Sequence, residues 1–303
     1  MCRHLAYLGE PLAPQDLLVT PSHALYRQSW APREQRHGTV NADGFGLGWY
    51  ADGDEVPARY RRAGPIWADA AFADLARVLR TRALVAAVRS ATAGCAAGEA
   101  AAAPFAAGRW LFSHNGAVAD WPGDLGALAA LLPPEELLAL EARSDSALLW
   151  GLTLHRLRAG ATPGEALAGT VADVAAHTTA RLNLLLTDGR SIAATAWGDT
   201  LYHRTLPGLG TVVASEPYDD EPPDDELYDD GPRADQPPDD ELYDDGPRAD
   251  QPPDQPRADG PQDGEPQNGE PRAGGPRWQR TPDRSLLLVD SGGVTVRPLP
   301  GRD

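Results

Sequence analysis

Apolar positions along the chain follow two kinds of pattern. Segments with apolar residues at helical spacing predict helices over Ile66–Leu79, Leu125–Ala142, Ser146–Arg158 and Pro163–Ala180. Short apolar runs bounded by turn-forming residues predict strands at Ala83–Val88, Trp110–Ser113, Leu182–Thr187, Ser191–Ala196, Thr211–Ala214 and Leu286–Val289. Strands near both ends of the chain with helices between them indicate a layered α+β domain.

Turn and cap residues refine these elements. Asp188-Gly189 separates two of the predicted strands and is typical of a tight hairpin, and Ser291-Gly-Gly predicts a second one near the end. Thr162-Pro-Gly-Glu165 combines an N-cap threonine, a first-turn proline and a glutamate in the capping-box position. Pro133-Pro134 is expected to break Leu125–Ala142 into two helices.

The net charge of −17 comes from one segment. Residues 216–276 hold 21 acidic and 4 basic residues, which leaves 23 of each elsewhere. The segment contains PPDDELYDDGPRADQ at 222–236 and again at 237–251. So much Pro, Asp and Gly cannot bury enough apolar surface to offset chain entropy, so we predict a disordered insertion, with an acidic interaction tail as the alternative. The globular domain is then 2–215 plus 277–303.

The remaining composition limits the partners. A neutral globular part argues against nucleic-acid binding, which needs a basic face. No apolar run approaches the roughly 18 residues of a membrane span, and we find no signal-peptide pattern. The two cysteines, Cys2 and Cys95, favour a reducing cytoplasm. No His, Cys and carboxylate cluster has metal-ligand spacing, so we expect neither metal nor cofactor, and the oligomeric state stays open.

Cys2 is the first candidate catalytic residue. Initiator methionine is normally removed before a small residue, which would leave Cys2 with a free α-amine. That amine has a pKa of about 7.7–8.0, so one residue would carry both a thiol nucleophile and a proton acceptor. A cysteine can also follow methionine by chance, so other residues have to support this interpretation.

Asn115 and Gly116 follow an apolar run, in the segment Ser-His-Asn-Gly. The Asn115 amide and the Gly116 N–H are donors that could stabilise a tetrahedral oxyanion. An Asn-Gly turn closing a hairpin is the alternative. His114 is grouped with the substrate-binding residues, although His114 and His4 are both expected to be packed or orienting rather than metal-ligating.

Three further residues suit an amino-acid substrate. Arg89 ends a predicted strand, and Thr92 follows three residues later, an arrangement that can grip a carboxylate. Asp145 could bind an ammonium group, although taken alone Ser144-Asp145-Ser146 favours helix capping, which is locally sufficient to explain it. The glycine-rich run from Asn41 lacks the strand, helix and spacing of a dinucleotide-binding loop.

These segments occur in a recognisable order: MCRHLAYLGE, NADGFGLGWY, RSAT, SHNG and SDSALLW. Together they resemble the class II glutamine amidotransferases, over residues 2 to about 215 and again from about 277. The resemblance implies an α+β, four-layer αββα sandwich and hydrolysis of a γ-glutamyl amide through a Cys2 thioester. Its implied roles are nucleophile for Cys2 and oxyanion hole for Asn115 and Gly116. Arg89 and Thr92 would hold the substrate α-carboxylate, and Asp145 its α-ammonium.

Two departures concern the leaving group. Arg3 stands where many family members have glycine, and Ala93 stands where the arginine motif often ends in histidine or glycine. No acceptor domain for ammonia accompanies the glutaminase-like part, so a stand-alone hydrolase of a small γ-glutamyl compound is favoured. Free glutamine is the alternative substrate, and a non-catalytic binding module on the same fold is the second alternative.

Overall fold

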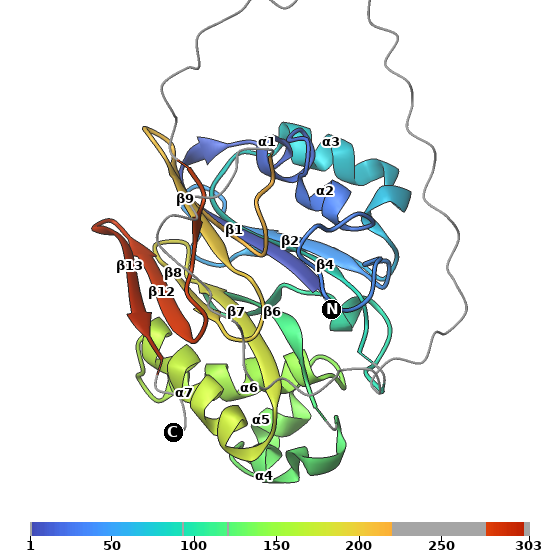
Figure 1. Ribbon diagram of the computed structural model, residues 1–303, viewed down its shortest axis with the longest axis vertical. Helices are drawn as coiled ribbons and strands as arrows, with labels where there is room; N and C mark the ends of the chain where they lie inside the picture. The colour runs from blue at the N-terminus through green and yellow to red at the C-terminus, as the bar shows by residue number, and fades with distance from the viewer. Residues whose placement is uncertain (1, 93, 120, 220–276, 300–303) are drawn as a thin grey trace, which may run out of the picture.

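The computed structural model describes residues 2–92, 94–119, 121–219 and 277–299. Two antiparallel sheets lie face to face, with helices covering the outer side of each (Figure 1). One helical layer contains α1 (Gln15–Leu18), α2 (Leu25–Gln28) and α3 (Ala70–Val78). The other contains α4 (Gly126–Ala129), α5 (Pro134–Leu138), α6 (Asp145–Arg158) and α7 (Pro163–His177). The expected four-layer αββα sandwich is therefore confirmed.

The first sheet, sheet A, has the strand order β11-β9-β10-β1-β4-β2-β3. Its strands are β1 (Cys2–Leu12), β2 (Phe45–Trp49), β3 (Ala58–Arg62), β4 (Thr81–Arg89), β9 (Tyr202–Leu206), β10 (Gly210–Ala214) and β11 (Gln279–Arg280). The central strand β1 pairs with β4 and β10, so that Cys2 lies opposite Arg89 and Leu5 opposite Ala214. The pairing fixes Cys2 at the edge where β1 begins and β4 ends.

The second sheet, sheet B, has the order β13-β12-β8-β7-β6-β5. Its strands are β5 (Phe105–Ala107), β6 (Trp110–Val118), β7 (Ala180–Thr187), β8 (Ile192–Ala196), β12 (Ser285–Asp290) and β13 (Gly293–Pro298). Strand β6 continues five residues beyond the predicted end at Ser113, and Asn115 pairs with Asn183 of β7. The alternative reading of Asn115-Gly116 as a hairpin turn is therefore wrong.

Side chains of β1 alternate between two apolar cores. Leu5 and Tyr7 pack with residues of the first helical layer, whereas Ala6 packs between the sheets with Leu111 and Leu185. A third core fills the space between sheet B and its helices. Because successive side chains of a strand point to opposite faces, Cys2 and His4 belong to the face between the sheets and Arg3 to the outer face.

The helix predictions hold with local changes. The capping box at Thr162 and Glu165 is present at the start of α7, and Pro133 separates α4 from α5 as expected. The Ile66–Leu79 helix is split, because a 3₁₀ turn at Ile66–Ala68 ends before α3 and Asp69 caps the new helix. Two more 3₁₀ turns lie at Glu99–Ala101 and Gly123–Leu125. The sequence patterns missed the short helices α1 and α2.

All six predicted strands and both predicted hairpins, β7–β8 and β12–β13, are present. The glycine-rich run from Asn41 leads into β2, whereas strands β1, β3, β5, β9 and β11 were not predicted. Of these, β1 matters most, because it carries Cys2. Its alternation is hidden since both of its faces are covered, by helices on one side and sheet B on the other, so apolar residues occupy both sets of positions.

The boundary of the acidic insertion needs one correction. We placed its start at residue 216, but Glu216 and Tyr218 are buried and Asp219 bonds Trp278, on the far side of the segment. The fold therefore continues to Asp219, and residues 220–276, with both repeats, lie outside the described residues. Among the residues described, no helix has the length and apolar character that a membrane crossing requires.

Candidate active site

Cys2 lies at the first residue of β1 and is partly exposed. Its backbone N–H donates to Oδ1 of Asn115 on β6, with a separation of 3.3 Å. This hydrogen bond joins the two sheets at the end where the predicted nucleophile lies. Met1 is outside the described residues, so the free α-amine remains a proposal. Once Met1 is removed, the bond to Asn115 Oδ1 would hold that amine beside the Cys2 thiol.

Asn115 is completely buried, and its Nδ2 donates to Ser215 Oγ at 3.3 Å. An amide NH₂ has two donors, so one N–H stays available for a ligand. Gly116 follows with φ +151°, and a Cβ there would come 1.9 Å from the Arg181 carbonyl oxygen. Only glycine fits, and it brings its own N–H beside the Asn115 amide. The two predicted oxyanion donors are therefore neighbours at the buried end of β6.

Asp145 begins α6 directly after its N-cap, since Ser144 Oγ accepts from the Ala147 N–H at 3.2 Å. The capping role therefore belongs to Ser144, and Asp145 has other contacts. Its Oδ2 accepts from the Val118 N–H at 3.3 Å, at the end of β6. Its Oδ1 accepts from the Ser146 N–H at 2.7 Å and from Cys95 Sγ at 3.7 Å. A carboxylate that is 3% exposed is thus held close to the oxyanion donors.

Arg89, at the end of β4, holds the segment that follows it. Its Nη2 donates to the Ala96 carbonyl at 2.9 Å, and its Nη1 donates to the Asp43 carbonyl at 3.4 Å. Thr92 starts the turn in this segment, where its carbonyl accepts from the Cys95 N–H at 3.1 Å. Ala93 lies outside the described residues. The arginine and threonine predicted to bind a carboxylate therefore share one short segment beside Cys2.

These contacts close a ring. Cys2 pairs with Arg89 and bonds Asn115, the last residues of β6 reach Asp145, and Asp145 bonds Cys95 next to the Arg89 segment. These contacts thus connect residues separated by more than 140 positions in the sequence, and they join the candidate nucleophile Cys2 to the carboxylate of Asp145.

His114 has no free ring nitrogen for a ligand, contrary to its place among the predicted substrate-binding residues. Nε2 bonds the Arg181 carbonyl at 3.0 Å, and Nδ1 bonds Ser146 Oγ at 2.9 Å. Burial lowers the pKa of His114, so the ring is neutral, with Nε2 donating and Nδ1 accepting. We therefore assign His114 a positioning role, because it ties the Asn115 strand to the start of α6.

Two other titratable groups lie beside the ring. His4 is completely buried on the face of β1 that carries Cys2, its Nδ1 bonds Ser113 Oγ at 3.1 Å, and burial lowers its pKa well below 6.5. Burial and the negative charge of Asp145 raise the pKa of Cys95 to about 12. The Cys95 thiol is therefore protonated near neutral pH and is a poor nucleophile. Cys2 remains the candidate nucleophile.

Two residues of this region were missed in the sequence. Asp43 fixes the end of β4, because its Oδ2 accepts from the Ala91 N–H at 2.7 Å and its own N–H donates to the Arg89 carbonyl at 2.8 Å. Ser215 bonds Asn115, as described above. The segments NADG and SEP contain them, but a lone aspartate or serine carries no sequence signal that separates a structural hydrogen bond from a catalytic one.

Within the described ranges, no three His, Cys, Asp or Glu side chains group as they would around a metal ion. The arrangement instead suits covalent catalysis by a thiol: a nucleophile, two adjacent donors for an oxyanion, and a charged residue for each end of an α-amino acid.

The chain belongs to the class II glutamine amidotransferases. The family model for "Glutamine amidotransferases class-II" matches residues 21–222. Solved structures of the same fold include a glutamine aminotransferase class-II domain protein from Silicibacter pomeroyi, which is 20% identical with a TM-score of 0.59 and covers 98% of this chain and 99% of its own. Glutamine phosphoribosylpyrophosphate amidotransferase from B. subtilis is 14% identical with a TM-score of 0.56, over 99% of this chain and 50% of that one.

Among its more similar relatives are two curated enzymes with one name. Gamma-glutamyl-hercynylcysteine sulfoxide hydrolase of Mycolicibacterium smegmatis is 44% identical over 235 residues, which cover 76% of this chain and 95% of the relative. The enzyme of the same name from Mycobacterium tuberculosis is 42% identical over 223 residues, which cover 73% of this chain and 87% of the relative. The chain therefore covers most of the length of both relatives.

Proposed function

We propose that this protein hydrolyses the γ-glutamyl amide of γ-glutamyl-hercynylcysteine sulfoxide, releasing glutamate and hercynylcysteine sulfoxide in ergothioneine biosynthesis. The observation that carries the proposal is the closed ring around Cys2, on a chain 44% identical to a relative that bears this name over 95% of that relative. The substrate is a small molecule, and the reaction needs only water as a second reactant.

In the proposed mechanism, Cys2 Sγ attacks the γ-carbonyl carbon of the substrate, and its α-amine accepts the thiol proton. The Asn115 amide and the Gly116 N–H donate to the oxyanion that forms. When the C–N bond breaks, the α-amine returns the proton to the leaving nitrogen, and a γ-glutamyl thioester remains on Cys2. Water then attacks the thioester carbonyl, which gives glutamate and restores the thiol.

Three side chains hold the glutamyl end in this proposal. Arg89, assisted by Thr92, binds the α-carboxylate, and Asp145 binds the α-ammonium. The Cys95 thiol now donates to Asp145 Oδ1, the atom to which an ammonium would also donate. Substrate therefore exchanges a weak S–H donor for a charged one at this carboxylate, which favours an α-amino group over a neutral substituent.

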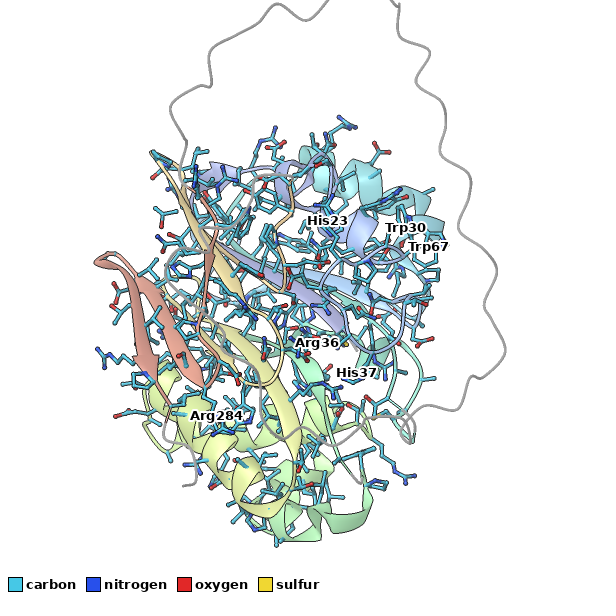
Figure 2. All side chains as sticks on the ribbon, in the orientation of Figure 1. His23, Trp30, Arg36, His37, Trp67 and Arg284 are labelled. Atoms are coloured by element: carbon cyan, nitrogen blue, oxygen red, sulfur yellow. The ribbon has the colours of Figure 1, made fainter. Side chains whose placement is uncertain are left out.

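The released half carries a trimethylammonium, which aromatic rings can bind through cation–π attraction. Two tryptophans are candidates for binding it, Trp30 and Trp49, but Trp30 already contacts other side chains and Trp49 lies away from the Cys2 end of the sheet. Arg27 lies over the Trp30 ring, 5.3 Å from its centroid, and Trp67 packs against the same ring, as Figure 2 indicates. Trp49 pairs with Leu84, four residues along β2 from the Cys2 end of the sheet. Neither supplies a free face beside the ring of site residues.

We also place the reaction in a reducing cytoplasm, as the two free cysteines favour. A disulfide or sulfenate at Cys2 would remove the nucleophile. Treatment of the active protein with hydrogen peroxide should therefore abolish glutamate release, and dithiothreitol should restore it.

The test uses purified full-length protein with the sulfoxide conjugate and, separately, with glutamine, and measures glutamate release. We expect rapid release from the conjugate and at most slow release from glutamine. The Cys2→Ala variant should lose at least about 10³-fold in kcat, as other enzymes do on loss of the nucleophile. Turnover of glutamine without cleavage of the conjugate would contradict the substrate, and an active Cys2→Ala variant would contradict the mechanism.

The second cysteine provides an internal control. Iodoacetamide at pH 7.5 should label Cys2 and leave Cys95 unlabelled, because the raised pKa of Cys95 keeps its thiol protonated. Intact mass before and after labelling also reports whether Met1 has been removed. Full activity in protein that retains Met1 would contradict the role of the α-amine.

A further inference from the structure

Ser215 connects the strand of the nucleophile to the oxyanion residue. Its side chain is completely buried between the sheets. Its Oγ accepts two hydrogen bonds, one from the His4 N–H on β1 at 3.0 Å and one from Asn115 Nδ2 on β6 at 3.3 Å. Among the described residues, no other side chain from outside β1 and β6 hydrogen-bonds to both of these strands beside Cys2. Cys2 precedes His4 by two residues, so one hydroxyl oxygen fixes both halves of the predicted chemistry.

The backbone at Ser215 shows how this position arises. The β1–β10 ladder ends with Leu5 opposite Ala214, and the next step would pair His4 with Ser215. The Ser215 N–H does donate to the His4 carbonyl at 3.0 Å. The return bond is different, because the Ser215 carbonyl turns away to accept from Thr200 Oγ1 at 2.8 Å. The hydroxyl replaces the carbonyl as acceptor for His4, and this places Oγ within reach of Asn115.

The consequence for Asn115 is a fixed carboxamide plane. Its Oδ1 accepts from the Cys2 N–H, and one Nδ2 hydrogen goes to Ser215 Oγ. With both ends of the amide held, the second Nδ2 hydrogen has a set direction. Donors contribute most to catalysis when they are oriented before the charge develops, because no reorganisation is then needed at the transition state.

We propose that Ser215 is a positioning residue, whose hydroxyl aligns the Asn115 carboxamide with Cys2 for stabilisation of the oxyanion. The proposal rests on the proposed hydrolysis of a γ-glutamyl amide. Ser215 itself does not contact the reacting atoms. Its removal should therefore weaken binding of the transition state and leave binding of the glutamyl group in the ground state unchanged.

Ser113 provides a matched control. Its hydroxyl is also completely buried between the sheets and also bonds His4, through Nδ1 at 3.1 Å, but it bonds neither Asn115 nor Cys2. Ser215→Ala and Ser113→Ala thus remove one buried hydroxyl each. In Ser215→Ala we expect kcat to fall about 10- to 100-fold with KM within about twofold, less than the loss of a whole oxyanion donor. In Ser113→Ala we expect kcat within about threefold of wild type.

A second measurement separates positioning from general damage. The aldehyde analogue of glutamate, with a γ-CHO group, would add the Cys2 thiol to form a hemithioacetal whose oxygen occupies the oxyanion hole. Its affinity should fall in Ser215→Ala by about the same factor as kcat, whereas the affinity of the product glutamate should stay within about twofold. Ser215→Thr, which keeps the hydroxyl, should recover most of kcat, and if its methyl group prevents folding, the comparison with Ser113→Ala still decides.

The outcomes are distinguishable. If wild-type protein releases no glutamate from any γ-glutamyl amide, the proposed function fails. If wild type is active and the two alanine variants lose kcat equally, the inference about Ser215 alone is overturned. Equal losses of affinity for glutamate and for the aldehyde would also overturn it, because they would indicate a distorted pocket.

Discussion

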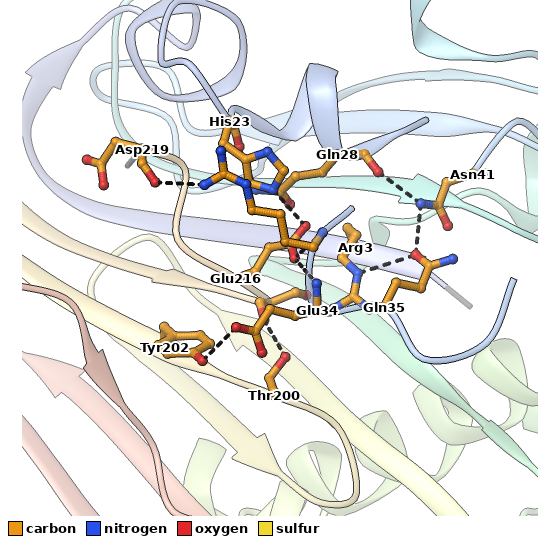
Figure 3. A network of polar contacts seen from close by, with 12 residues as sticks. Arg3, His23, Gln28, Glu34, Gln35, Asn41, Thr200, Tyr202, Glu216 and Asp219 are labelled. Carbon is orange, nitrogen blue, oxygen red and sulfur yellow. Dashed lines mark hydrogen bonds and ion pairs between the residues drawn. The ribbon is translucent and has the colours of Figure 1, made fainter. Parts of the chain in front are cut away.

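Two buried polar clusters lie on opposite faces of sheet A, and neighbouring residues supply them. On the inner face, Cys2, His4 and Ser215 meet Asn115 of sheet B. On the outer face, Arg3 and Glu216 lie under the loop that follows α2, where Arg3 Nε donates to Gln35 Oε1 at 3.3 Å (Figure 3). Strand alternation sends each neighbour to the other side. Neighbouring residues of the same two segments therefore place candidate catalytic groups on one face and hold the loop on the other.

The two clusters differ in charge. In the inner cluster, His4 is uncharged because burial lowers its pKa. The outer cluster is ionic: Glu216 bonds His23 at 3.2 Å and accepts from the backbone N–H of Glu34 at 2.6 Å. Burial lowers the pKa of Arg3 while Glu216 opposes that shift, and both Nη atoms have no acceptor among the described side chains. Neutral groups can keep their orientation while charge develops in the reaction, whereas the buried charges hold the loop in place.

The largest expected effect concerns pH and two buried histidines, His4 of the inner cluster and His114, which bonds Ser146 of α6. The native pKa values of His4 and His114 both lie below 6.5, so below pH 6.5 the unfolded chain binds protons that the native state does not. Stability is therefore fully present above pH 6.5 and falls as the pH decreases. Each such histidine contributes a slope of up to about 1.4 kcal/mol per pH unit as the pH falls below 6.5.

Urea unfolding at several pH values measures this slope. His114→Gln keeps a polar side chain at that position. It should reduce the slope by the contribution of one titrating histidine, because the unfolded chain then binds about one proton fewer. The same substitution at His177, which is exposed on α7, is the control. A slope that His114→Gln leaves unchanged would contradict a neutral, buried His114.

The second prediction concerns the outer cluster. Arg3→Met keeps most of the apolar length of the side chain but removes the cation near Glu216 and the donor to Gln35. We expect a loss of about 1–3 kcal/mol in the free energy of unfolding, with kcat within about threefold. Arg3→Lys retains the charge and should lose less. Urea unfolding and initial rates on the same samples check both expectations. If Arg3→Met lost kcat as Ser215→Ala is expected to, without losing stability, the distinction between the two faces would be wrong.

The sequence predicted most of the fold and the types of residue in the site, but not the face of the strand on which each side chain lies. Five ordered segments sufficed to predict site roles for Cys2, Asn115, Gly116, Arg89 and Asp145; contacts in the structure connect the elements that carry them, and the roles themselves stay predictions. The spacing of residues in the sequence could not reveal that both ring nitrogens of His114 are hydrogen-bonded within the fold, because these bonds depend on Ser146 and on Arg181 of a distant strand. It could not place Ser215 either, since its role follows from one carbonyl turning toward Thr200.

The acidic segment, which follows the outer cluster in the chain, should have the smallest effect. Its flanks are fastened to each other: Trp278 Nε1 donates to Asp219 Oδ1 at 3.0 Å, and the Tyr218 and Trp278 rings lie 4.9 Å apart. Arg204 Nη1 also donates to Asp219, at 2.6 Å. Because these contacts lie wholly within the fold, they fix where residues 220–276 leave and return, and the segment itself need not contribute to the site.

Deletion of 222–251 removes both perfect repeats, about half of that segment. If the segment is disordered, as its composition predicts, halving it should stabilise the fold by about 0.6 kcal/mol through a smaller loop-closure entropy, with kcat unchanged. Asp219→Asn, which weakens the fastening instead, is the contrasting variant and should destabilise. A deletion that lowers stability by more than about 1 kcal/mol, or lowers kcat, would mean that the repeats contact the fold.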